Sequence, residues 1–105
     1  MTPIPTTAND LLKETLKRYK VSACAAAVGA RLPNKTVYSL ITDDNPRRFT
    51  AKTDLLLCAY FGLKPGTFLY QQTTYELFVT ELMLREDLLK INIFNTIRGK
   101  TNVAD

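Results

Sequence analysis

The stretch that decides the fold is residues 22–69, SACAAAVGARLPNKTVYSLITDDNPRRFTAKTDLLLCAYFGLKPGTFL. It predicts two short helices joined by a tight turn, followed by another helix and a closing turn, which is the order of a helix-turn-helix unit. The alanine run at residues 25–27 has small side chains, and small side chains let two helix backbones approach closely. We therefore expect the first helix of this unit to pack tightly against its neighbours.

Before the turn, two helices are expected. Apolar side chains at helical spacing predict the first over residues 10–20. The second should have Ser22 as its N-cap and run to about Ala30. Residues 1–8 contain two prolines, which resist helix, so this part is expected to be a flexible N-terminal arm.

After the turn, the sequence predicts three further helices. Pro33 suits the first position of the third helix, which should end near residue 41, because the missing N–H costs nothing there. A polar loop over residues 42–48 should follow. Thr50 then caps a fourth helix that ends at Gly62, and a short fifth helix is expected around residues 67–71.

The predicted fold is therefore all-α, with a five-helix domain over residues 9–72 and a helical extension with a disordered tail over residues 73–105. The end of the extension alternates apolar and polar residues, so a short strand at residues 91–97 is an alternative. The wide apolar stripe of the extension must be shielded from water by another surface. We expect a dimer or partner interface; the alternative is that the helix folds back on its own domain. The interface residues are Leu77, Leu84, Leu88, Ile91 and Phe94.

The charge is unevenly distributed along the chain. The net charge is +4, from 14 Lys and Arg against 10 Asp and Glu. Residues 1–72 hold ten basic and five acidic side chains, or +5, and the remainder holds four and five, or −1. A polyanion should therefore be drawn to the first two thirds of the chain.

Composition argues against several classes of protein. There is no histidine, no glycine-rich phosphate loop and no metal-ligand spacing, so neither an enzyme nor a cofactor is expected. Cys24 and Cys58 lie in apolar runs and are expected to be reduced core residues, with a disulfide or a redox switch as the alternative. The longest apolar run, residues 55–61, is too short to span a bilayer, and the opening residues lack the pattern of a signal peptide. A cytoplasmic location without membrane partners is expected.

Two groups of positions carry a resemblance to a known family. The first group is the cap Ser22, the pair Ala26 and Ala27, the turn residue Leu32, and Val37 and Leu40 on the third helix. The second is the segment at residues 49–77, with Gln72 and the triplet Tyr75, Glu76 and Leu77. With these positions, residues 9–78 resemble the lambda-repressor-like, or Xre-type, helix-turn-helix family, and within it the HigA class of antitoxins. Arg31 stands where this family usually has a turn glycine, so the turn must be made at some conformational cost.

A helix-turn-helix reader needs polar side chains on the first turns of its second helix, which enters the major groove. The candidate base-reading residues are Asn34, Lys35, Thr36, Tyr38 and Ser39; the alternative is that they are ordinary solvated residues. The candidate phosphate contacts are Ser22, Arg31, Arg47, Arg48 and Lys52; for the pair Arg47 and Arg48 the alternative is an ordinary solvated loop. Asp43 and Asp44 would repel DNA unless the loop turns them away or pairs them with the arginines.

The resemblance and these side chains together predict a sequence-specific regulator of transcription that binds double-stranded DNA as a homodimeric repressor. An alternative is a HigA-like antitoxin that binds and neutralises a toxin protein, with or without DNA binding. A third possibility is a protein with the same fold that binds no nucleic acid and whose apolar extension binds another partner.

Overall fold

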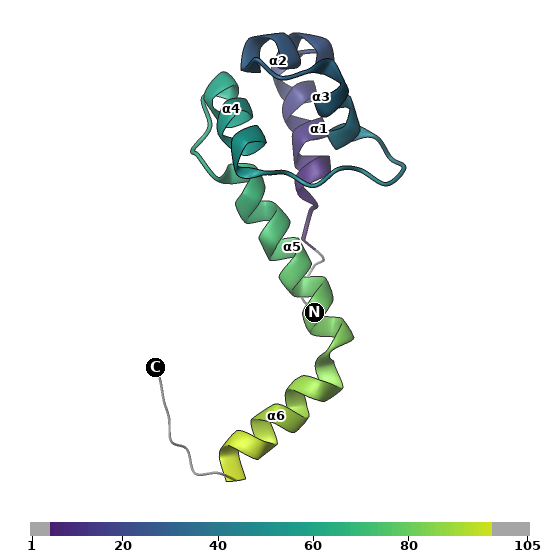
Figure 1. Ribbon diagram of the computed structural model, residues 1–105, viewed down its shortest axis with the longest axis vertical. Helices are drawn as coiled ribbons and strands as arrows, with labels where there is room; N and C mark the ends of the chain where they lie inside the picture. Colours follow the sequence, from purple (N-terminus) through teal and green to yellow (C-terminus); the bar gives the residue numbers. More distant parts are fainter. Residues whose placement is uncertain (1–4, 98–105) are drawn as a thin grey trace.

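The computed structural model describes residues 5–97, with side chains through residue 91. Within this range the chain is all-α and contains no strand (Figure 1). The helices are α1 (Ala8–Tyr19), α2 (Ala23–Ala30), α3 (Asn34–Ile41), α4 (Ala51–Phe61), α5 (Thr67–Met83) and α6 (Arg85–Ile97). The expected all-α class is therefore confirmed for the described residues, and the strand considered at residues 91–97 is wrong, because α6 continues to Ile97.

The core lies where α1–α4 meet the first turns of α5. Leu12, Leu40, Leu57 and Phe68, from α1, α3, α4 and α5, are all 0% exposed. Helix α2 adds Ala26, also 0% exposed. Complete burial of a leucine or phenylalanine side chain stabilises the fold by about 1.5–3 kcal/mol, so these residues dominate the hydrophobic stabilisation of the domain.

Helix α2 packs as closely as its small side chains predict. Its buried residues are Ala23, Ala26, Ala27 and Ala30. On α2, a Cβ atom at Gly29 would lie 2.1 Å from Cε1 of Tyr60, so only glycine allows this ring of α4 to lie against the α2 backbone. Cys24 faces the other way and is exposed, which makes its assignment to the core wrong; Cys58 is buried as expected, and both are free thiols. Burial raises the pKa of the Cys58 thiol.

Several expected helix ends are confirmed. The Ser22 hydroxyl accepts from the Ala25 N–H at 3.0 Å, and Thr50 caps α4 in the same way. Helix α4 stops where Gly62 takes the left-handed conformation, with φ 73°. One expectation is wrong: Pro33 is the N-cap of α3, with ψ 142°, and not its first helical residue. The Pro33 carbonyl accepts from the Val37 N–H at 3.3 Å, which is the first bond of the helix and is the bond that an N-cap residue accepts.

The fifth helix is longer than expected. Helix α5 continues without a break to Met83, because no glycine or proline lies between Thr67 and that residue. The expected end of the domain at residue 72 therefore falls inside α5.

The N-terminal segment is more ordered than expected where it is described. Ala8 opens α1 and is 2% exposed, so α1 begins two residues before the predicted start. The carbonyl of Thr6 accepts from the Gln71 side chain at 2.6 Å, which holds this segment against α5. Ala8 therefore belongs to α1, and residues 5–7 of the expected arm lie outside any helix, with one hydrogen bond to α5 at Thr6; residues 1–4 lie outside the described part.

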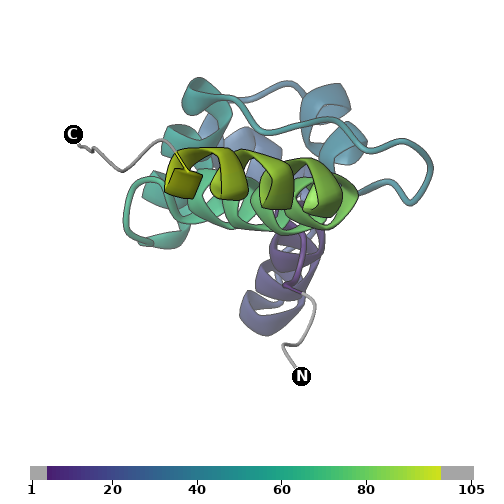
Figure 2. The same cartoon turned by 90° about the horizontal axis from the view of Figure 1, so that it is seen from below.

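Beyond the core, the end of α5 and all of α6 stand away from the domain (Figure 1), and in the view from below α6 lies in front of the domain (Figure 2). We call residues 77–97 the C-terminal projection. Helix α6 follows α5 and lies apart from α1–α4 (Figure 1), so the alternative that it folds back as core is wrong. The radius of gyration is accordingly 18.3 Å, whereas a compact domain of this length has about 13 Å.

Candidate nucleic-acid interface

Helix α3 has one face in the core and one face open to solvent. Val37 and Leu40 are both 0% exposed and dock the helix on α1 and α2. Asn34, Lys35 and Tyr38 are exposed, and Tyr38 retains 52% of its surface. Residues three and four positions apart share a face of a helix, so Tyr38 lies beside both Lys35 and Asn34, and the three form one open face at the start of α3.

The other two candidate base-reading residues are less available. Thr36 and Ser39 are half-buried on the flank of α3. The Ser39 hydroxyl donates to the Thr36 carbonyl at 2.7 Å, so its proton is already in use within the helix. The structure therefore brings three of the five sequence-predicted residues together on the open face and leaves two beside it.

The far end of α3 is held by hydrogen bonds from other segments. Asn9 on α1 donates through Nδ2 to the carbonyls of Leu40 and Arg47, at 2.8 and 2.9 Å. The Arg47 N–H donates to the Ser39 carbonyl at 2.8 Å. Carbonyls in the last turn of a helix have no partner within it, so these bonds satisfy groups that would otherwise need water. They also fix the angle of α3 on the domain.

The loop between α3 and α4 is attached to α5. Gln72, which is buried, accepts from the Phe49 N–H at 2.7 Å and donates to the Phe49 carbonyl at 3.2 Å. The Phe49 ring stacks on Phe68 with centroids 4.9 Å apart. An amide side chain that satisfies both main-chain groups of one residue leaves the loop little freedom there.

The candidate phosphate contacts differ in how free they are. Arg48 forms an ion pair with Glu76 on α5, in which the two side chains remain 67% and 43% exposed. Arg47 and Lys52 are exposed, and Ser22 is exposed while its oxygen caps α2. A cation that is already paired must exchange its partner to reach a phosphate, so Arg48 is the least ready of the set.

Arg31 occupies the turn immediately before α3. It is exposed and has φ 59° and ψ 43°, which is the left-handed conformation. The expected conformational cost of a non-glycine residue here is therefore present, and a side chain in this region costs roughly 1–2 kcal/mol. In return the turn carries a positive charge three residues from Asn34.

The two aspartates of the loop behave differently from the expectation. Asp43 pairs with Lys13 on α1, and not with either arginine. The hydrogen bond from Lys13 holds the pKa of the Asp43 carboxyl below its usual value and raises the pKa of the Lys13 ammonium. Asp44 is exposed beside it. One of the two negative charges in the loop is thus compensated before any ligand arrives.

Asp54 is a residue that the sequence reading did not single out. It is 1% exposed, and its two carboxylate oxygens accept from three main-chain N–H groups: Gly66 at 2.7 Å, Phe68 at 2.8 Å and Leu69 at 3.1 Å. Gly66 is the N-cap of α5 and has no side chain that could accept these bonds. A glycine at a predicted helix start, with an aspartate in the preceding helix, is the signal that could have found it.

The expected interface residues of the C-terminal projection are accessible. Leu77, Leu84, Leu88 and Ile91 are 64%, 41%, 37% and 54% exposed. Phe94 lies outside the residues whose side chains are described.

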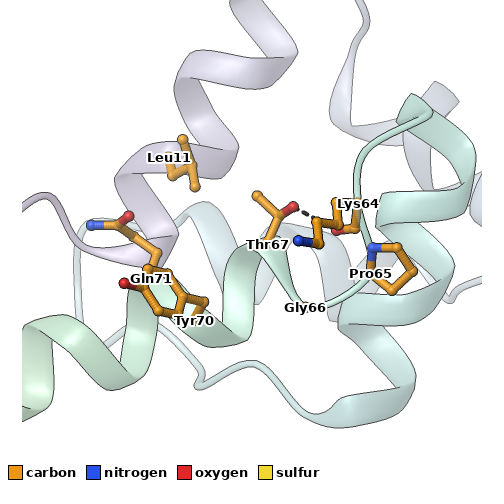
Figure 3. A pocket seen from close by; sticks show the side chains of 7 residues that line it. All are labelled: Leu11, Lys64, Pro65, Gly66, Thr67, Tyr70 and Gln71. Atoms are coloured by element: carbon orange, nitrogen blue, oxygen red, sulfur yellow. Dashed lines mark hydrogen bonds between the residues drawn. The ribbon is translucent and has the colours of Figure 1, made fainter.

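An open groove of about 500 Å³ lies between the start of α1 and the turn that leads into α5 (Figure 3). Its lining is Leu11, Lys64, Pro65, Gly66, Thr67, Tyr70 and Gln71. Lys64 is the one charged side chain among these lining residues, and Tyr70 is 74% exposed. Such an open, sparsely polar groove lacks the convergent polar groups typical of a ligand site.

Two further features are absent from the described residues. No group of three or more His, Cys, Asp or Glu side chains is placed to hold a metal ion within this part of the chain. None of the described helices has the length and apolar content needed to cross a membrane.

Comparisons with protein-family models, with curated proteins and with solved structures gave no match to this chain.

Proposed function

We propose that this protein is a sequence-specific regulator that binds double-stranded DNA, with a lambda-repressor-like unit over residues 9–72 and α3 as the reading helix. The observation that carries the proposal is the open face of Asn34, Lys35 and Tyr38 on a short helix whose opposite face is fully buried. A helix presented in this way can enter the major groove, which is about 12 Å wide.

The three side chains supply different kinds of base contact. Asn34 can make two hydrogen bonds to adenine, and Lys35 can donate to the acceptor edge of guanine. Tyr38, one turn further, offers a hydroxyl for a phosphate or base and a ring for apolar contact. Thr36 and Ser39 are secondary contributors in this proposal, because both are half-buried.

Phosphate contacts would set the register of the reading helix. Arg31 lies in the turn before α3, and Arg47 lies beside its last turn through the bond to Ser39. These two cations therefore flank the reading helix along its length of about 12 Å. Contacts of this type give affinity without sequence preference and weaken as salt rises.

A single reading helix covers only a few base pairs. The proposed regulator therefore acts as a two-fold dimer, which places two copies of α3 about one turn of DNA apart. Repression of its own or a neighbouring promoter is the simplest use of such a protein.

The antitoxin alternative rested on Gln72 and the triplet at residues 75–77. Gln72 bonds to Phe49 and Glu76 pairs with Arg48, so both side chains have a role in holding the loop before α4. Because folding alone accounts for these residue types, we propose no toxin-binding role for them.

The test is a salt titration of binding to the DNA upstream of the gene, against a scrambled duplex of equal length. We expect at least about 1000-fold tighter binding to the upstream DNA at physiological salt, as is usual for specific complexes. Affinity for both duplexes should fall as salt rises. Equally weak binding to the two duplexes would contradict the proposal.

A further inference from the structure

Asn9 on α1 holds both ends of the loop that follows α3. Its side-chain nitrogen Nδ2 donates to the Leu40 carbonyl at 2.8 Å and to the Arg47 carbonyl at 2.9 Å. The Arg47 N–H donates in turn to the Ser39 carbonyl at 2.8 Å. Three hydrogen bonds therefore close the loop where it leaves and rejoins α3, and two of them come from one amide group.

The loop depends on these bonds more than α3 does. Val37 and Leu40 are both 0% exposed, so packing already fixes α3 on the domain. Residues 42–48 of the loop are all exposed, and the loop turns at Asn45 with a left-handed φ of 52°. A segment without buried side chains takes its position from hydrogen bonds to its neighbours.

Helix α1 reaches the same loop at a second point. Lys13, four residues after Asn9 and therefore on the same side of α1, pairs with Asp43. The Asp43 side chain is 92% exposed, and ion pairs in water contribute little. The Leu40 carbonyl, in contrast, belongs to a residue at 0% exposure, so its bond to Asn9 cannot be replaced by solvent without rearrangement. Asn9 is therefore the stronger of the two attachments.

The residue that this closure places is Arg47. Its main chain lies within hydrogen-bond distance of the last turn of α3, and the residue is exposed. In the described part of the chain Arg47 has no acidic partner within ion-pair distance, whereas its neighbour Arg48 pairs with Glu76. Arg47 can thus meet a phosphate without first giving up a partner.

We infer that Asn9 is a positioning residue of the proposed DNA interface, because it closes the loop after α3 and so sets Arg47 for a phosphate contact beside the reading helix. The inference rests on the proposed function. A group that is held in its bound position beforehand loses less entropy when the complex forms. Loss of the closure should therefore weaken the phosphate contact, although Asn9 itself touches no DNA.

The experiment is a double-mutant cycle on the full-length protein, with the upstream and scrambled duplexes at several salt concentrations. Asn9→Leu keeps the size of the side chain and the charge of the protein and removes both donors. We expect it to weaken binding to both duplexes about 5-fold and to lower the salt dependence by about one phosphate contact, as Arg47→Ala should. The variant with both changes should bind no more weakly than Arg47→Ala alone.

Lys52→Ala is the matched control, since Lys52 is an exposed candidate phosphate contact on α4, which begins beyond the loop. Its effect should add to that of Asn9→Leu. A general loss of stability in Asn9→Leu would instead add to the effects of both Arg47→Ala and Lys52→Ala.

Amide hydrogen exchange followed by NMR tests the closure without DNA. Asn9→Leu should speed exchange of the Arg47 N–H at least about 10-fold. Exchange of the Phe68 N–H, which bonds to Asp54 in the core, should change less.

Two results would overturn the inference and leave the proposed function standing. One is unchanged exchange of the Arg47 N–H in Asn9→Leu, and the other is an additive effect of Asn9→Leu and Arg47→Ala on DNA affinity. Equally weak binding of the wild type to both duplexes would contradict the proposed function and the inferred phosphate contact together.

Discussion

At the scale of single residues, Asp54 is the side chain on which the domain depends most. It is an ionisable group at 1% exposure that satisfies three N–H groups at the start of α5. Because these donors have no capping side chain of their own, removal of the carboxylate leaves them unpaired in a buried place.

We expect Asp54→Ala to lower the free energy of unfolding by about 2–4 kcal/mol. Urea denaturation followed by circular dichroism measures this change. Asp44→Ala is the matched control, since Asp44 is exposed in a loop, and it should shift stability by less than about 0.5 kcal/mol. Equal effects of the two substitutions would show that Asp54 is not the cap of α5.

Arg31 is expected to lower the stability of the fold through its backbone conformation and to raise DNA affinity through its charge. Its left-handed backbone is one that glycine adopts without strain. We expect Arg31→Gly to leave stability unchanged or raise it by up to about 1 kcal/mol, because the relieved strain is partly offset by the greater freedom of glycine in the unfolded chain.

The same substitution should weaken DNA binding about equally across sequences and reduce the dependence on salt by about one phosphate contact. Arg31→Lys retains the charge and serves as the comparison. If Arg31→Gly binds DNA as well as the wild type at every salt concentration, this turn makes no phosphate contact.

At the scale of elements, the loop before α4 is held by two side chains of α5. Gln72 bonds to the main chain of Phe49, and Glu76 pairs with Arg48. Release of Arg48 would add a free cation to the proposed DNA surface.

We therefore expect Glu76→Gln to raise affinity for both specific and scrambled DNA by a few-fold at low salt, with the gain lost at high salt. Equilibrium titrations at two salt concentrations measure this. Glu81→Gln removes the same charge from an exposed position further along α5 and should have a smaller effect. Weaker binding by Glu76→Gln would mean that Glu76 positions Arg48 for DNA.

The helix starts and ends were predictable where their signals are local. Ser22, Thr50 and Gly62 act within three residues of their own position, and each was predicted correctly. The face of α2 was not predictable, because ACAAAVGA is apolar on every side, and so Cys24 was placed in the core in error.

Features that depend on distant partners could not be predicted from the sequence. Asp54 meets groups 12 to 15 residues away, and Arg48 meets Glu76 across two elements. The open face of α3 could be predicted in part, since Val37 and Leu40 mark its buried side. The hydrogen bond from the Arg47 N–H to the Ser39 carbonyl could not be predicted, because it depends on how the loop returns to α3.

At the scale of the whole molecule, the chain separates two tasks. The described residues up to 72 form a basic domain in which α3 is held by hydrogen bonds, and residues 77–97 extend from it as the C-terminal projection. In the proposed function the domain reads DNA, and the projection carries the residues expected at a dimer or partner interface. The uneven charge along the sequence already indicated two parts, but only the structure excluded the alternative that α6 folds back on the domain.

The measurement that tests the central claim most directly is the specificity of the double variant Asn34→Ala with Lys35→Ala, from the open face of α3. Its affinity for the upstream duplex and for a scrambled duplex should be compared with that of the wild type at physiological salt. Lys64→Ala, which removes one charge from the turn before α5, is the control. We expect the double variant to lose 10- to 100-fold or more in affinity for the upstream DNA, while its affinity for scrambled DNA changes only a few-fold. Unchanged preference for the upstream DNA would contradict the assignment of α3 as the reading helix.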